Sequence, residues 1–131
     1  MAAHALEIIL SRQLADCLTV PIFITDPAGN LLYYNEPAEE ILGRRFEETG
    51  PMVVEEWSTI FHPMDDDGHP FPTAQLPLVR TLRTKDPAHG SFWIKGLDQK
   101  LRHLAVTSYP IIGRNNHYSG AMAIFWVKEE R

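Results

Sequence analysis

The chain has 131 residues, of which 44% are apolar and 22% charged. These shares are close to the averages of globular proteins, so they exclude wholesale disorder and allow one domain with a hydrophobic core. Seventeen acidic and twelve basic residues give a formal net charge of −5. The sequence lacks both a run of ~20 apolar residues and a signal peptide, and its single cysteine, Cys17, excludes an internal disulfide. We therefore expect a reduced, cytoplasmic protein.

Charge is distributed unevenly along the chain. Residues 36–67 hold ten acids and two bases, whereas residues 68–131 hold nine bases and four acids. The bases of the second half are scattered over several candidate faces and are not interleaved with stacking aromatics, which argues against direct binding of nucleic acid. The pattern favours a polarised docking surface.

The N-terminal third predicts a helix followed by a hairpin. Residues 5–18 carry apolar side chains at helical spacing, at Leu6, Ile9, Leu10, Leu14, Cys17 and Leu18. We expect this helix to be amphipathic and Cys17 to be a small buried hydrophobic residue. Residues 21–25 and 31–34 are rich in β-branched and aromatic residues, and the Pro-Ala-Gly segment between them has turn chemistry.

Short helices and a long loop are expected in the middle of the chain. Asn35 is placed to cap a helix that Gly43 ends. A second short helix is expected over residues 55–61 and a third over 74–85. Residues 62–73 contain three prolines and three consecutive aspartates, and this composition predicts a loop.

The last third changes to strand character. Residues 91–95, 101–109 and 118–127 are strand candidates, with turns at 96–99 and 113–116. Closely spaced strands with short links indicate an antiparallel meander. The predicted fold class is α+β: a five-stranded antiparallel sheet with helices on one face and the N-terminal amphipathic helix beside it.

Several motifs, taken in order, resemble the PAS domain family. They are Ile24-Thr25-Asp26-Pro27-Ala28-Gly29-Asn30-Leu31, then Asn35, Ala38 and Ile41-Leu42-Gly43, and near the end Leu104-Ala105-Val106-Thr107-Ser108-Tyr109-Pro110 and Gly120-Ala121-Met122-Ala123-Ile124-Phe125. The resemblance divides the chain into an N-terminal flanking helix at 1–19, a PAS domain at 20–127 and the start of a charged connector at 128–131.

The resemblance implies a cavity between the helices and the sheet. Strand alternation then selects the inward-facing residues. The implied ligand-binding residues are Phe23, Thr25, Leu78, Leu82, Phe92, Ile94, Leu104, Val106, Ser108 and Phe125, and Ala123 shares their face. Thr25 and Ser108 are the polar members, and either one would orient a ligand through a hydrogen bond.

Two coloured cofactors found in the family are not expected here, and the cofactor is otherwise left open. A flavin adduct requires a cysteine in the helical layer, whereas Cys17 precedes the first strand and the equivalent sheet positions are the apolar Ile94, Leu104 and Phe125. A haem requires an axial histidine from the helical layer, and the predicted helix at 74–85 has none. His62, His69 and His89 flank that helix in loops or at element ends.

The acidic segment Asp65-Asp66-Asp67-Gly68-His69 resembles half of a calcium loop. It lacks the bidentate glutamate at the required spacing, and a transition-metal site that also used His62 would be cramped. We expect a charged turn and no metal. Neighbouring glutamates such as Glu39 and Glu40 point in different directions on a helix, so we expect no catalytic pair and no enzyme.

The outward face of the predicted sheet is apolar and requires a cover. It carries Ile22, Ile24, Met122, Ile124 and Trp126. The N-terminal helix and a second subunit are the two candidate covers, and we expect a homodimer formed through that helix and the outer sheet face. As a PAS domain the chain would be a sensor in signal transduction, as in two-component systems or transcription regulation.

The output of such a sensor would be an output domain in a larger protein or a docking partner. The sequence leaves two other functions open. One is a small cone-shaped α+β enzyme acting on an apolar substrate, and the other is a dimerisation module with a filled core.

Overall fold

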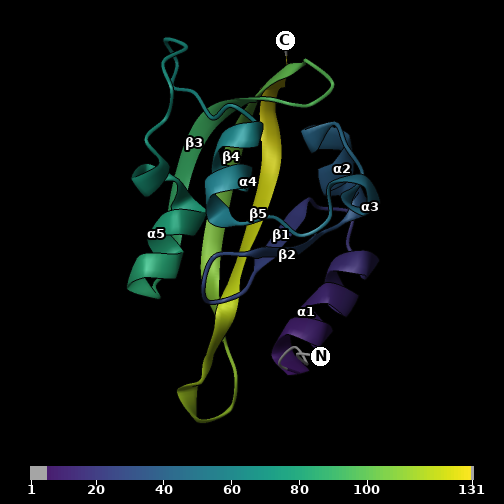
Figure 1. Cartoon of the computed structure of the whole chain (residues 1–131), viewed down its shortest axis with the longest axis vertical. Helices are drawn as coiled ribbons and strands as arrows, with labels where there is room; N and C mark the ends of the chain where they lie inside the picture. Colours follow the sequence, from purple (N-terminus) through teal and green to yellow (C-terminus); the bar gives the residue numbers. More distant parts are fainter. Residues whose placement is uncertain (1–5, 131) are drawn as a thin grey trace.

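The computed structural model describes residues 6–130, so Ala5 of the expected first helix and Arg131 of the expected connector lie outside the described residues. The elements follow in the order α1 (Leu6–Cys17), β1 (Ile22–Thr25), β2 (Leu31–Tyr34), α2 (Glu36–Leu42), α3 (Phe46–Thr49), α4 (Val54–Ile60), η1 (Thr73–Gln75), α5 (Pro77–Thr84), β3 (Ala88–Lys95), β4 (Leu101–Ile112), η2 (Arg114–Asn116) and β5 (Tyr118–Glu130) (Figure 1). No helix among these residues has the length and apolar character needed to cross a membrane.

The five strands form one antiparallel sheet in the order β2-β1-β5-β4-β3, which confirms the predicted α+β class. The central strand β5 pairs with β1 through Phe23 and Ala123 and with β4 through Val106 and Phe125. Because side chains alternate along a strand, β5 presents Ala123 and Phe125 to one face and Met122 to the other.

Two hydrophobic cores lie on the two faces of the sheet. The larger core joins the inner face to α2, α4 and α5, and Figure 1 shows α4 in front of β4. The smaller core joins α1 to the outer face and comprises Ile8, Ala15, Ile22, Ile24, Ile111 and Met122. The outward orientation expected for Ile22, Ile24 and Met122 is therefore confirmed.

Helix α1 is rotated relative to the expected orientation. It buries Ile8 and Ala15, whereas most of the expected apolar stripe is exposed, with 66% of Leu6 and 55% of Leu14 open to solvent. Cys17 is also exposed, so the expectation of a buried cysteine was wrong. The side chains of Glu7 and Asp16, which bond to Ser119 and Tyr33, lie on the side that faces the sheet and oppose any other rotation.

A buried asparagine joins α1, β1 and α2. The Asn35 Oδ1 accepts hydrogen bonds from the backbone amides of Ala38, as the predicted cap, and of Ile22, at 3.3 and 2.9 Å. Its Nδ2 donates to the carbonyls of Ala15 and Val20 at 3.0 and 2.9 Å. All four hydrogen-bonding positions of this side chain are satisfied.

Several elements differ from the sequence prediction. Helix α3 was not expected, because its two glutamates hide any apolar period. The helix expected at residue 74 begins at Pro77, after the separate turn η1, since proline at the first helical position suits a helix start. Strand β3 begins three residues earlier than expected, and β4 ends three residues later. Strand β5 continues to Glu130, so Glu129 and Glu130, expected to belong to a connector, are paired with β4.

Both edges of the sheet carry an isolated bridge. Met52 pairs with Leu31 at the β2 edge, and Met64 pairs with Trp93 at the β3 edge. The Met64 bridge uses both backbone groups, because each residue donates its amide to the other's carbonyl, at 2.7 and 2.9 Å.

A buried arginine lies where β4 begins. Arg102 is 5% exposed, and its guanidinium donates to the carbonyl of Ile41 in α2 at 2.7 Å and to the carboxylate of Asp98 at 2.9 Å. It also lies 3.6 Å from the Glu130 carboxylate at the end of β5. The arginine thus holds α2, the β3–β4 turn and the end of β5 together.

Candidate ligand-binding cavity

An apolar cavity of about 80 Å³ lies between the inner face of the sheet and the helical layer. It is lined by Phe23, Leu42, Trp57, Pro63, Leu76, Pro77, Leu78, Phe92, Ile94, Leu104, Val106, Ala123 and Phe125. Every strand except β2 contributes a side chain, so the cavity wall spans most of the sheet.

Seven of the ten residues expected to bind a ligand line this cavity. They are Phe23, Leu78, Phe92, Ile94, Leu104, Val106 and Phe125. Strand alternation placed the six strand residues correctly on the inner face, because the register of β1, β3, β4 and β5 brings their side chains to one side of the sheet, and Leu78 reaches the cavity from α5. Their role toward a ligand stays a prediction.

The other three expected residues do not line the cavity. Ser108 is fully buried, and its hydroxyl lies 2.7 Å from the hydroxyl of Thr81 on α5, so the two groups satisfy each other. Thr25 is also fully buried, and its hydroxyl has no hydrogen-bond partner among the described residues. Leu82 packs against the inner core from α5, away from the cavity. Both expected polar ligand contacts are therefore outside the cavity.

The helical layer supplies lining residues that the sequence reasoning did not select. Trp57 on α4 is the largest, and its ring meets Phe23 edge-on with centroids 5.4 Å apart. Its indole nitrogen donates to the Gly29 carbonyl at 2.8 Å, which turns its apolar surface toward the cavity. In the sequence, Trp57 is an apolar residue in a short predicted helix, and such a position indicates core packing without indicating a cavity.

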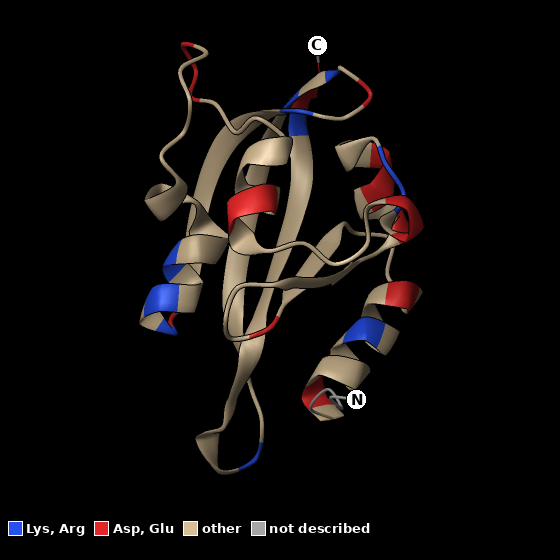
Figure 2. Ribbon diagram, viewed as in Figure 1, with Lys and Arg blue, Asp and Glu red and all other residues tan. Residues whose placement is uncertain are grey.

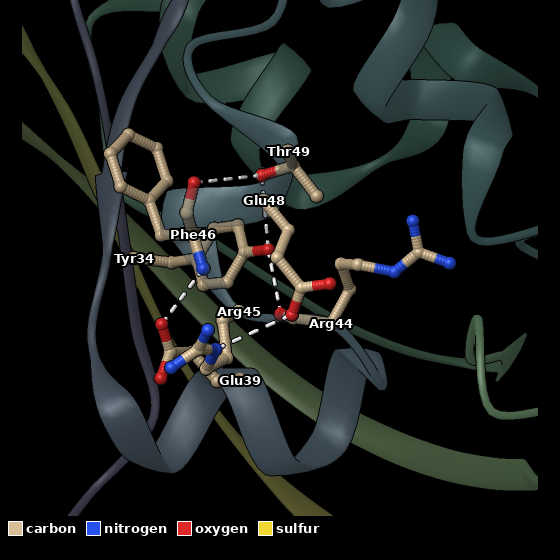
Figure 3. Close-up of polar contacts among 7 residues, drawn as sticks. All are labelled: Tyr34, Glu39, Arg44, Arg45, Phe46, Glu48 and Thr49. Atoms are coloured by element: carbon tan, nitrogen blue, oxygen red, sulfur yellow. Dashed lines mark hydrogen bonds and ion pairs between the residues drawn. The ribbon is translucent and has the colours of Figure 1, made fainter.

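Hydrogen bonds at the junction between α2 and α3 hold the end of α2, which carries the cavity residue Leu42, in position. The Tyr34 hydroxyl donates to the Arg44 carbonyl at 2.8 Å, and the Phe46 amide donates to the Glu39 carboxylate at 2.8 Å (Figure 3). Burial raises the pKa of Tyr34, so this phenol stays protonated and keeps donating. Neither polar group faces the cavity.

Apart from the buried Arg102, the charged residues that the structure describes are partly or fully exposed. Acidic side chains gather on α2 and α3, whereas α5 carries bases, as Figure 2 shows. No residue that lines the cavity has a carboxylate, an imidazole, a thiol or a hydroxyl. The cavity therefore offers no side chain that could act as an acid, a base or a nucleophile.

The acidic loop forms a turn. The Asp65 Oδ1 accepts the backbone amides of Asp67 and His69, both at 2.9 Å, and these bonds lower the pKa of the Asp65 carboxyl group. Asp65, Asp67 and His69 carry possible ligand atoms within 4.8 Å of one another, and His62 does not belong to this group. The bonds to the backbone account for the arrangement.

Neither flavin nor haem fits the cavity. A cavity of about 80 Å³ is smaller than the ~150 Å³ apolar cavity that holds a single benzene ring. The lining has no cysteine for an adduct and no histidine for an axial bond, and Cys17 lies on α1 across the sheet. The volume and the side chains of the cavity are therefore unsuited to a flavin adduct and to a haem.

Comparison with protein families gives one match, to a model described as a PAS domain, over residues 10–79. This match covers more than half of the chain, from α1 to the start of α5. No curated protein matches the sequence.

Several solved structures share the fold. The PAS domain of a protein from Colwellia psychrerythraea superposes with a TM-score of 0.64 at 16% identity, covering 92% of this chain and 95% of the other. The PAS domain of BvgS from Bordetella pertussis gives 0.68 at 16% identity, covering 95% and 88%. A LOV protein from Rhodobacter sphaeroides gives 0.73 at 12% identity, covering 94% and 68%. At these identities the likeness is one of fold.

Proposed function

Since this chain belongs to the PAS domain family, we propose that it is a non-catalytic sensory domain in which a small molecule occupies the cavity between the helices and the sheet. The observation that carries the proposal is the apolar cavity itself, which is walled by the central strand β5. A dimerisation module with a filled core would have no reason to keep such a space. An enzyme would need a catalytic side chain in the wall, and the lining residues provide none.

Strand β5 supplies a physical route from the cavity to the surface. Its Ala123 and Phe125 line the cavity, whereas Met122, the residue before Ala123, packs against α1 in the outer core. A ligand that displaces the inner side chains therefore also moves the surface on which α1 rests. The ligand shifts the domain between two states only if it binds one of them more tightly.

A cavity-filling substitution tests this relay without a ligand. Ala123→Leu adds volume inside the cavity, and Ala105→Leu adds the same volume on the outer face of β4. We expect Ala123→Leu to change hydrogen exchange in α1 and along β5, and Ala105→Leu to change only nearby amides. Unchanged exchange in α1 of the folded Ala123→Leu variant would contradict the relay.

The exposed side of α1 supports a homodimer as the assembly that carries the signal. Leu6, Ile9, Leu10 and Leu14 form an apolar stripe that the sheet does not cover, and Trp126 of the outer face is 48% exposed. A two-fold interface places the same surface of each copy against the other, so a single apolar patch is enough to bury both stripes. In this proposal, a change in α1 reaches the partner subunit and then an output domain or docking partner.

The oligomeric state tests the dimer. We expect a dimer mass by light scattering for the unaltered chain and a monomer mass for the double variant Leu10→Glu, Leu14→Glu. Val53→Glu, at an exposed site in the opposite layer, is the matched control and should remain dimeric. A monomeric unaltered chain at ~100 µM would reject the dimer, as would a dimer that survives the double substitution.

A further inference from the structure

The chemistry of the cavity wall restricts what the sensor can bind. The lining side chains are hydrocarbon, apart from the Trp57 indole nitrogen, which already donates to Gly29. Thr25 and Ser108, the polar residues expected to orient a ligand, lie outside the lining, and Ser108 is paired with Thr81. A carboxylate, phosphate or sugar would lose its hydration here and gain no side-chain partner.

The size of the cavity sets a second restriction. Its volume of about 80 Å³ is roughly half of the ~150 Å³ apolar cavity that accommodates benzene. Benzene has six non-hydrogen atoms, so by that comparison the cavity accommodates about three non-hydrogen atoms without movement of the wall. An acyl chain, a fused ring system or a tetrapyrrole would fit only if the wall moved.

The same lining also disfavours water as the occupant. An ordered water needs two to four polar partners, and the lining side chains of this partly open cavity offer none. A ligand therefore displaces no well-ordered water, and it gains dispersion contacts with the wall. These terms favour a ligand that water itself solvates poorly.

We infer that the ligand of this cavity is a small, uncharged, apolar molecule of about three non-hydrogen atoms, of the class of short or cyclic hydrocarbons. This inference rests on the proposed sensory function and adds the chemical class of the ligand. The aromatic rings of Phe23, Trp57 and Phe92 belong to the lining and supply apolar contact surface for such a molecule.

Three probes of matched size test the class. Cyclopropane, dimethyl ether and formate each have three heavy atoms and differ in polarity. In methyl-labelled protein, we expect cyclopropane to shift the resonances of Ile94, Leu104 and Val106 at the lowest concentration. Dimethyl ether should require at least about tenfold more, and formate should cause no saturable shift. The methyl groups of Ile22 and Ile24 on the outer face should not respond to any probe.

Variants show whether the shifts report the cavity. Ala123→Leu should raise the apparent dissociation constant for cyclopropane at least about tenfold, whereas Ala105→Leu should leave it unchanged. If Ala123→Leu does not fold, Val106→Ile removes a smaller part of the cavity and should weaken binding to a lesser degree.

The outcomes separate this inference from the function on which it rests. Tighter binding of formate than of cyclopropane overturns the apolar class and leaves a ligand-binding sensor standing. A larger or polar molecule retained at stoichiometric amount in native mass spectra does the same. No response to cyclopropane overturns the inference. It also overturns the sensory proposal only if native mass spectra show no bound molecule.

Discussion

Replacement of Asn35 by alanine tests how far one side chain holds α1 onto the domain. Asn35 is 1% exposed, so water does not replace the four partners that the substitution leaves: two backbone amides and two carbonyls. Each such hydrogen bond contributes about 1 kcal/mol net, and the longer bond to Ala38 contributes least. We expect a loss of about 3–4 kcal/mol in the free energy of unfolding, a large part of a typical domain's 5–15 kcal/mol.

Urea unfolding followed by circular dichroism measures this loss, with the slope m checked for constancy. Asn30→Ala is the matched control, because the side-chain amide of Asn30 makes one hydrogen bond, to the Asp26 carboxylate at the half-buried hairpin turn. This substitution should lower the free energy of unfolding by about 0.5–1 kcal/mol. Proteolysis should also release α1 earlier in Asn35→Ala, since the Ala15 carbonyl loses its anchor. A loss below about 1 kcal/mol with unchanged m would refute the reasoning.

Three further substitutions test the end of the sheet and its packing. Arg102→Met removes the hydrogen-bond donor of the Ile41 carbonyl and of the Asp98 carboxylate. We expect urea titrations to show a free energy of unfolding lower by about 3 kcal/mol, and a loss under about 1 kcal/mol would show that the arginine does not link these elements. The Arg102 hydrogen bond lowers the pKa of the Asp98 carboxyl group below its ordinary 3.8, so the stabilisation is present above that value and lost as pH falls through the lowered pKa. Melting temperatures of Asp98→Asn and the unaltered chain should therefore differ near neutral pH and converge in acid, below the lowered pKa of Asp98; a gap that persists there would point to another cause. Gly120→Ala should lower the free energy of unfolding by at least about 2 kcal/mol, because Gly120 has a φ of +145° and an added Cβ would lie 2.1 Å from the Thr25 carbonyl oxygen. An unchanged melting temperature would show that β1 shifts to make room for the methyl group.

The strand framework followed from local chemistry. The Asp26 carboxylate accepts the amides of Ala28 and Asn30, so the hairpin turn is specified within five residues. The cap at Asn35 and the left-handed Gly43 are equally local, and both were predicted at their observed positions. The five-stranded sheet could therefore be predicted before any tertiary contact was known.

The rotation of α1 and the polarity of the cavity depend on contacts between distant segments. Leu10 and Leu14 have the apolar character of a buried face, yet Ala15 is the residue that packs beneath the Asn35 anchor. Strand alternation correctly turned Ser108 inward, but only the position of α5 decides that Thr81 covers its hydroxyl. Sequence periodicity predicts which side chains face the inner side of the sheet. Which of these side chains line the cavity depends on how the helices pack against them.

The bridges at Met52 and Met64 have a consequence for self-association. An open sheet edge is a template on which other chains add strands, and repeated addition ends in fibrils. Here β2 has only four residues beside Met52, and Met64 occupies both backbone groups of Trp93 on β3. Farther along β3, the His89 carbonyl accepts a hydrogen bond from Arg80. Growth by strand addition is thereby discouraged at both sides, so copies of the domain can meet face to face at high concentration without seeding amyloid.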